Sequence, residues 1–182
     1  MITASQAAID RYTADGWWGS ETIGAIVRRH AAERPGDEAL VDPPNREEIT
    51  DGAPCRLSWR ELVDRMERIE CGLIGAGLRA DDVIVVQLPN TWELAVIYLA
   101  CAELGIVVSA VPALYREYEI GHVADIAGAR AIITTARIGR ADHIAMARRV
   151  TVNQPMQVID IAQLVSAPLD AALLRSAQDA SG

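Results

Sequence analysis

The amino-acid sequence predicts an α/β fold with an open, mostly parallel sheet and helices on both of its faces. Three apolar runs carry this prediction, at residues 83–88, 106–111 and 131–135, and the first two end at a proline. Continuous apolar runs are typical of strands that are buried on both faces. Segments with helical patterning separate these runs, and strands that alternate with helices form βαβ units with a parallel sheet.

The elements before this sheet begin with an arm over residues 1–20. The run Gly16-Trp17-Trp18-Gly19 interrupts any helical period, and two exposed Trp side chains would be costly. We therefore expect both Trp side chains to anchor the arm on the body, with a substrate lid as the alternative. Thr22 caps a helix that extends to Glu33. A short strand at 39–41 precedes residues 42–55, whose Pro and Gly predict a loop or a loose hairpin.

The strongest local signal is a capping box at Ser58 and Glu61, in which each side chain satisfies a backbone N–H of the first helical turn. Leu57 and Leu62 occupy the hydrophobic staple positions around it. Apolar residues then recur at the spacing of one helix face. They are Leu62, Met66, Ile69 and Leu73. Gly75 and Gly77 end this predicted helix.

The second half of the chain continues the alternation. Asn90-x-x-Glu93 resembles a further capping arrangement and opens an apolar helix that reaches Leu104. Helices are expected at 117–127 and 142–150, and a further strand at 157–161. Residues 166–182 contain a weak helical patch and then a stretch with the composition of a linker. These boundaries predict three parts: an arm (1–20), an α/β subdomain (21–165) and a tail (166–182).

Composition excludes several classes of protein. The 182 residues carry a formal net charge of −8, and all 17 cationic side chains are Arg, since no Lys is present. A chain without Lys has no Schiff-base lysine, no lysine general base and no P-loop lysine. The sequence pI of about 4.9 argues against a nucleic-acid partner. A hydrophobic content of 51% excludes a disordered chain.

Cysteines and targeting signals indicate a cytoplasmic protein. Cys55, Cys71 and Cys101 are odd in number and lack C-x-x-C spacing, so buried free thiols are expected rather than disulfides or a zinc site. The first twelve residues have no apolar core of the signal-peptide type. The longest uncharged run, 104–115, is shorter than the roughly 18 to 20 residues that a membrane span needs.

The letters G-x-G-x-x-A at Gly75, Gly77 and Ala80 match part of a dinucleotide-binding fingerprint. That fingerprint requires a strand before the glycines and a helix after them, so that the pyrophosphate meets a helix N-terminus. In this sequence a helix precedes the glycines and a strand follows. We therefore interpret the motif as a helix end and a turn.

Three histidines, His30, His122 and His143, are not spaced as metal ligands. His143 follows Asp142 at an expected helix start and is predicted to be solvated surface. His122 has Glu119 and Asp125 three residues to either side. This pattern favours a charged helix face, and the alternative is a weak metal or acid–base site.

Arginine pairs and strand ends complete the candidates. Arg28-Arg29 and Arg148-Arg149 could clamp a phosphate, although cations near helix C-terminal ends are also favoured by the helix dipole. In open parallel sheets, ligands bind beyond the carboxyl ends of the strands. Those ends are expected at 88–90, 111–113 and Thr134-Thr135, and none is glycine-rich. A G-x-S-x-G nucleophile elbow is also missing. The sequence thus predicts no catalytic, cofactor-binding or metal residue within the chain.

Several motifs together resemble the adenylate-forming (AMP-binding) superfamily, which includes acyl-CoA synthetases and aryl-acid AMP ligases. Residues 57–62 (LSWREL) are similar to its L-[ST]-Y-x-E-L core motif. Residues 102–112 (AELGIVVSAVP) resemble L-K-A-G-x-A-Y-V-P, with Glu103 and Leu104 in place of Lys and Ala. Residues 86–93 (VQLPNTWE), 115–120 (YREYEI) and 12–18 (YTADGWW) also resemble family segments. The order and spacing of these motifs cover about residues 10–165.

The resemblance implies that the chain is the N-terminal subdomain of an ATP-dependent carboxylic acid–CoA ligase. Such a parent enzyme would use ATP, Mg²⁺ and CoA on a small carboxylic acid. The family's phosphate loop and its lysines are missing here, so the tail would lead toward an absent phosphate-loop subdomain. The chain alone is then expected to be an inactive scaffold that binds no cofactor and contributes one wall of the acid pocket.

Two rival functions stay open at this point. One is a stand-alone, non-catalytic α/β binding module, a degenerate paralogue. The other is a small nucleotide-binding protein of flavodoxin type, which is disfavoured because no phosphate loop is present. A face that another subdomain would cover should also be exposed in the isolated chain. Self-association into a homo-oligomer through that face is therefore expected.

Overall fold

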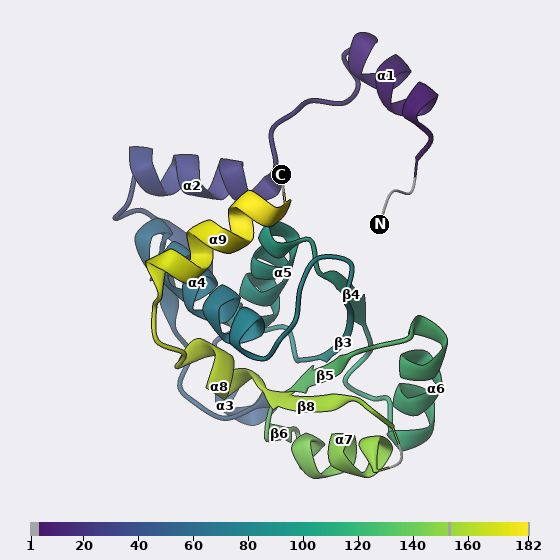
Figure 1. Ribbon diagram of the computed structural model, residues 1–182. Coiled ribbons are helices and arrows are strands. Elements are labelled where there is room, and N and C mark those ends of the chain that lie inside the picture. Colours follow the sequence, from purple (N-terminus) through teal and green to yellow (C-terminus); the bar gives the residue numbers. More distant parts are fainter. Residues whose placement is uncertain (1–3, 153, 182) are drawn as a thin grey trace.

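A parallel sheet lies at the centre of the computed structural model, which describes residues 4–152 and 154–181 (Figure 1). Its strands are β3 (Val83–Gln87), β4 (Val107–Ala110), β5 (Ala131–Thr134) and β8 (Gln157–Asp160). They lie in the order β4-β3-β5-β8, and every neighbouring pair is parallel. The predicted fold class is therefore confirmed.

Helices cover both faces of this sheet. On one face, Ile84, Val86 and Ile133 belong to the larger core, which includes side chains of α4 (Trp59–Gly75), α5 (Trp92–Leu104) and α8 (Ile161–Val165). On the other face, Val85 and Ile132 pack with α6 (Glu117–Ala127) and α7 (His143–Thr151). Because successive strand residues point to opposite faces, a continuous apolar run supplies both cores. Figure 1 shows the two helix layers on either side of the strands.

Residues 38–58 form a second, smaller sheet. Strands β1 (Glu38–Val41) and β2 (Arg56–Ser58) pair in antiparallel register, and the short helix α3 (Arg46–Ile49) lies between them. The expected loop or loose hairpin therefore contains a helical turn. A further antiparallel pair, β6 (Arg137–Ile138) with β7 (Ala141–Asp142), follows β5.

The predicted capping box is confirmed at the start of α4. The Ser58 hydroxyl accepts from the Glu61 backbone N–H at 3.4 Å, and the Glu61 carboxylate accepts from the Ser58 N–H at 2.8 Å. Helix α2 (Ile23–Glu33) also begins as predicted, with the Thr22 hydroxyl as its N-cap. Both helices pack together, and α4 contributes Met66, Ile69 and Leu73, which have no exposed surface.

The arm contains a helix, α1 (Gln6–Ala14), which stands away from the rest of the chain (Figure 1). Trp17 and Trp18 are 70% and 44% exposed, so the prediction that they anchor the arm on the body is wrong. Their rings instead contact Tyr12 of the same arm, with ring centroids 5.5 and 5.0 Å apart. Local ring contacts thus replace contacts with the body. The lid alternative stays a prediction.

The helix in the tail is longer than the sequence indicates. Helix α9 (Ala171–Ser181) extends through the stretch expected to be a linker, and Gly182 lies outside the described residues. The Asp170 carboxylate accepts from the backbone N–H groups of Ala172 and Leu173, which holds the first turn. Leu174 is buried where α9 packs on α4 and α5. The three domain boundaries themselves stay predictions.

Candidate functional site

An apolar cavity of about 530 Å³ lies at the carboxyl ends of β3 and β4. Its lining includes the residues after β3 and β4 that the sequence marked as strand ends, together with Ile49 of α3 and Ile138 of β6. Its lining is Ile49, Val86, Leu88, Pro89, Asn90, Leu94, Ala110, Val111, Pro112, Ala113 and Ile138. This is the edge of an open parallel sheet at which ligands bind.

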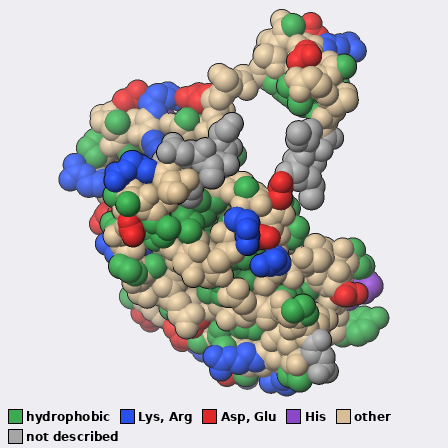
Figure 2. Space-filling view, in the orientation of Figure 1, with side chains coloured by type: hydrophobic (Ala, Val, Ile, Leu, Met, Phe, Trp, Pro, Cys, Tyr) green, Lys and Arg blue, Asp and Glu red, His purple; other side chains and the backbone are tan. Residues whose placement is uncertain are grey.

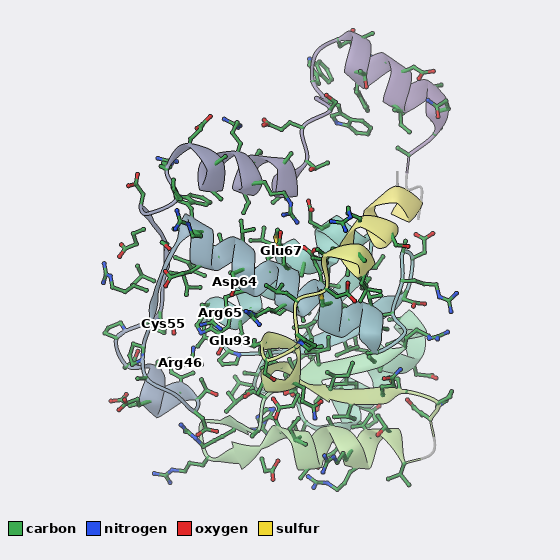
Figure 3. The ribbon with its side chains drawn as sticks, turned by 60° about the vertical axis from the view of Figure 1, so that its left-hand side comes forward. Arg46, Cys55, Asp64, Arg65, Glu67 and Glu93 are labelled. Atoms are coloured by element: carbon green, nitrogen blue, oxygen red, sulfur yellow. The ribbon has the colours of Figure 1, made fainter. Side chains whose placement is uncertain are left out.

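A buried ion-pair cluster fixes the elements beside this cavity (Figure 3). The Arg46 guanidinium donates to both Glu93 carboxylate oxygens and to Asp42 Oδ2, the last at 2.8 Å. Asp42 Oδ1 accepts from the Trp92 backbone N–H at 2.8 Å, and Oδ2 also accepts from the Cys55 N–H at 3.2 Å. One arginine thus ties α3, the β1–β2 connection and the start of α5 together.

The cluster also determines the protonation states of Arg46 and Cys55. Pairing with Glu93 raises the pKa of Arg46, so the guanidinium stays charged. Burial and then the nearby Asp42 carboxylate raise the pKa of the Cys55 thiol to about 11. A thiol with this pKa is protonated at neutral pH and is therefore a poor nucleophile.

Glu93 corrects one prediction from the sequence. The residue before α5 is Thr91, which makes no side-chain capping bond to the helix. The Glu93 carboxylate binds Arg46 instead of returning to the backbone at Asn90. A distant buried cation outcompetes a local cap, because a charge-assisted bidentate pair is stronger than a single capping bond.

His143 is buried and only 1% exposed, so its prediction as solvated surface is wrong. The Gln87 amide nitrogen donates to the carbonyl oxygens of Pro112 and Tyr115, at 2.9 and 3.1 Å. Its oxygen therefore faces His143 Nδ1, 2.8 Å away, which must carry the proton. Burial and the Arg116 charge lower the pKa of His143, so the ring is neutral.

The Gln87–His143 pair joins three segments at the carboxyl edge: the end of β3, the loop after β4 and the start of α7. The two neighbouring Thr side chains, Thr134 and Thr135, have different surroundings at this edge. Thr134 is fully buried and donates to the Gln87 carbonyl oxygen at 2.9 Å. Thr135 is only partly buried and lies in a narrow hollow beside Arg46 and Glu93. Thr134 is therefore structural.

The other predicted candidates have structural roles. Gly75 ends α4, and Gly77 has a φ of +80° in the following turn, as expected for a helix end. His30 contacts the Trp59 ring, with centroids 4.8 Å apart. His122 is exposed and stacks on Tyr118, which agrees with a solvated helix face.

The arginine pairs do not converge on one another. Arg28 binds carboxylates of α4 and α5, whereas Arg29 pairs with Glu21 at 3.0 Å. Arg149 pairs with Glu117 at 2.6 Å, and Arg148 is exposed. Each paired guanidinium is therefore engaged by a carboxylate rather than arranged for a phosphate. Figure 2 shows basic and acidic side chains interspersed over the visible face.

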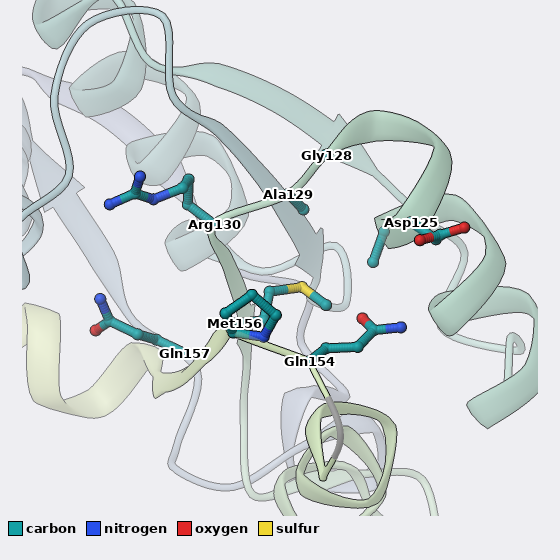
Figure 4. A pocket seen from close by; sticks show the side chains of 9 residues that line it. Asp125, Gly128, Ala129, Arg130, Gln154, Met156 and Gln157 are labelled. Atoms are coloured by element: carbon teal, nitrogen blue, oxygen red, sulfur yellow. The ribbon is translucent and has the colours of Figure 1, made fainter.

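A second hollow of about 530 Å³ lies at the opposite edge of the sheet, before β5 and β8 (Figure 4). Two of its polar side chains, Arg130 and Gln157, already have partners. Arg130 lies 4.0 Å from Asp82, and the Gln157 amide donates to the Ala76 carbonyl oxygen at 3.0 Å. These contacts hold the turn after α4, so the carboxyl-edge cavity is the better candidate site.

The described residues carry little catalytic chemistry. Within them, no three His, Cys, Asp or Glu side chains lie together as a metal-binding group, and no helix is both long and apolar enough to cross a membrane. The three cysteines are free thiols. The candidate site is therefore an apolar surface with a rigid, charged support rather than a set of reactive groups.

Sequence reasoning missed three of the residues that support this site, Asp42, Arg46 and Gln87, and assigned the fourth, Glu93, to a helix cap. Asp42 and Arg46 lie in a segment that looks like a polar loop, and only their burial distinguishes them from solvated charges. A polar Gln at the end of an otherwise apolar strand was the one available signal, since a buried amide needs partners.

Comparisons with known proteins give the family. A model of the AMP-binding enzyme family matches residues 27–181. A salicylyl-CoA synthase / salicylate adenylyltransferase from Streptomyces is 37% identical over 149 residues, which cover 81% of this chain and 25% of that protein. A 2,3-dihydroxybenzoate-AMP ligase from Bacillus subtilis is 31% identical over 80% of this chain and 25% of its own length.

Solved structures agree with the fold. The apo structure of Mycobacterium smegmatis MbtA has a TM-score of 0.74 at 23% identity, over 93% of this chain and 32% of that one. The N-terminal domain of FACL13 from Mycobacterium tuberculosis has a TM-score of 0.67 at 18% identity, over 82% of this chain and 37% of that one. The chain spans about a quarter of the length of the curated relatives it matches. It belongs to the AMP-binding enzyme family and corresponds to its N-terminal subdomain.

Proposed function

We propose that the protein is the N-terminal part of an ATP-dependent aryl-acid–CoA ligase. The parent would join a carboxylate to ATP, giving an acyl adenylate and pyrophosphate, and then transfer the acyl group to the CoA thiol with release of AMP. The supporting observation is family membership together with 37% identity to a protein named for salicylyl-CoA synthesis. Free thiols support a cytoplasmic location.

Family membership implies ATP and Mg²⁺, but the described residues do not fit them. Carboxylate ligands for Mg²⁺ are not gathered in a metal-binding group among these residues, and the chain has no Lys to meet a phosphate. The carboxyl ends of β3, β4 and β5 carry no glycine-rich loop. We assign nucleotide binding to the rest of the parent and a scaffold role to this chain.

We assign to the carboxyl-edge cavity one wall of the acid pocket. Its apolar lining suits an aromatic ring, and the Arg46 and Gln87 networks hold it rigid, which limits the cost of ordering a wall on binding. Filling the cavity with Ala113→Phe in the parent should raise KM for the acid several-fold. Ala136→Phe, on an exposed residue outside the lining, is the matched control. An unchanged KM in Ala113→Phe would show that the cavity is not a wall of the acid pocket.

The scaffold role is tested by carboxylate-dependent exchange of labelled pyrophosphate into ATP. The isolated 182-residue chain should give no exchange above a reaction without acid. The product of the reading frame that continues beyond the Gly182 codon should exchange with salicylate or a related aryl acid. Exchange by the isolated chain would overturn the scaffold role. A stop codon directly after Gly182 would instead support a stand-alone binding module.

A further inference from the structure

Helix α2 is attached to the body through an ion-pair cluster with an excess of carboxylates. Arg28 Nη1 donates to Glu67 Oε1 at 2.7 Å on α4, and Arg28 Nε donates to Glu103 Oε2 at 3.2 Å on α5. Glu70 of α4 is the third carboxylate, with its Oε1 3.7 Å from Arg28 Nη2. One guanidinium therefore faces three acids.

Glu70 is the member of the cluster that lacks hydrogen bonds. It is fully buried, and both of its oxygens have no hydrogen-bond partner among the described residues; neither does the Arg28 Nη2 that faces it. An ionised carboxylate without hydrogen bonds is expensive to bury. Since Glu67 and Glu103 already occupy Arg28, a third negative charge would be poorly compensated.

We propose that protonation of Glu70 keeps α2, and with it the preceding arm, docked on the layer formed by α4 and α5. Loss of this proton weakens the docking of α2. In the protonated cluster, one cation pairs directly with two anions, Glu67 and Glu103, so the net charge is −1. Ionisation of Glu70 adds a third anion to a site that cannot solvate it. The repulsion is relieved when Arg28 and α2 move away and water enters.

The surroundings of Glu70 support this assignment. Burial, opposed in part by Arg28 and reinforced by Glu103 and Glu67, raises its pKa to about 8. The Cys101 thiol of α5 is also close, and burial together with Glu70 raises the pKa of that thiol to about 12, so it stays neutral. Helices α8 and α9 also pack on α4. Their buried side chains there, Leu164 and Leu174, are apolar.

Close packing makes α2 sensitive to this cluster. A Cβ atom at Gly24 would lie 1.5 Å from Glu103 Oε1, so a larger residue at this contact of α2 with α5 would have to displace the Glu103 side chain. Glu103 also stands where the family motif has Lys. With a Lys at this position, Arg28 would face a like charge, so Arg28 and Glu103 form a matched pair in this chain.

The sign of the pH dependence follows from the raised pKa of an acid. Docking of α2 is strongest below the ordinary Glu value of about 4.5, weakens as pH rises, and levels off above about 8. Hydrogen exchange of the α2 amides, corrected for the intrinsic effect of pH, measures this directly. Protection of residues 23–33 should fall by up to about tenfold per pH unit between pH 5 and 8.

Glu70→Gln keeps the shape of the side chain and cannot ionise, so its α2 protection should not change with pH. Glu33→Gln, on an exposed α2 carboxylate, is the matched control and should behave like the wild type. A pH-independent wild type, or a Glu70→Gln protein that keeps the wild-type slope, would overturn the proposal. If Glu70→Gln does not fold, a pH titration of the carboxyl ¹³C shift of wild-type Glu70 tests the proposal. A titration midpoint near 8 supports it, and a midpoint near 4.5 refutes it.

Discussion

Arg46 and Arg28 join elements of the same subdomain through carboxylates, but their clusters differ in how completely they are satisfied. Around Arg46, the Asp42 and Glu93 oxygens all accept hydrogen bonds, from the guanidinium or from backbone N–H groups. Around Arg28, Glu70 keeps two oxygens without a partner. The first cluster can therefore serve as a rigid support beside the cavity, while the second has a group that can titrate. The two clusters differ in role because they differ in how many carboxylate oxygens lack a hydrogen bond, although both contain buried carboxylates.

The largest expected effect is at Arg46. Arg46→Met leaves two buried carboxylates without their cation, and such a loss costs about 3 to 5 kcal/mol in free energy of unfolding. Urea denaturation measures it. Arg56→Met is the control, since the Arg56–Glu38 pair is exposed and should contribute less than about 1 kcal/mol. Equal losses of unfolding free energy in Arg46→Met and Arg56→Met would contradict the larger contribution assigned to the buried cluster.

Replacing one acid in each cluster by Met sharpens the comparison. Glu93→Met removes the bidentate partner of Arg46 and should cost about 3 kcal/mol. Glu70→Met removes a carboxyl group that has no hydrogen bond, so at pH 8 it should be neutral or stabilise by about 1 kcal/mol. Urea denaturation of both variants at pH 8 is the measurement. A loss at Glu70 as large as that at Glu93 would show that the clusters are energetically alike.

Gly24 tests the packing beside Arg28 with a smaller effect. In Gly24→Ala the new methyl group must displace the Glu103 carboxylate, which should weaken its pair with Arg28 and cost about 1 kcal/mol. Gly75→Ala is the matched control, because a Cβ there would meet no other part of the described structure within 4 Å, apart from its own turn of α4. Alanine is favoured over glycine in a helix by about 0.5 to 1 kcal/mol, so this control should be neutral or stabilising. Thermal unfolding compares the two.

The smallest expected effect concerns His143, in the Gln87–His143 pair at the carboxyl edge of the sheet. Its pKa is lowered by burial and by Arg116, so its contribution to stability is present above the ordinary His value of about 6.5 and is lost as pH falls. Between pH 7.5 and 5, the wild type should lose more stability than His143→Gln, which keeps a donor toward Gln87. The exposed His122→Gln variant should follow the wild type. An identical pH dependence of His143→Gln and wild type would exclude a neutral buried His143.

The sheet and most helices were predictable because their signals are local. The apolar runs before Pro89 and Pro112 and the Ser58–Glu61 capping box each depend on residues near in sequence. The site was not predictable in the same way. Glu93 looks like a cap until Arg46, 47 residues away, is placed beside it. His143 looks exposed until Gln87, 56 residues away, offers it a partner.

The arm shows the opposite error. Two Trp side chains are expected to be buried on the body because their apolar area is large, but both rings contact Tyr12 of the same arm instead. The expected lack of catalytic residues stays a prediction. It depends on a feature that the sequence shows directly, since the chain has 17 Arg and no Lys.

The most direct test of the central claim is the mass of the product formed by the longer reading frame with an aryl acid, ATP and CoA. The account predicts an aryl-CoA thioester with the longer protein and no adenylate or thioester with the isolated 182-residue chain. Only an aryl adenylate, even with CoA in excess, would contradict CoA as the acceptor. An adenylate formed by the isolated chain would contradict the scaffold role.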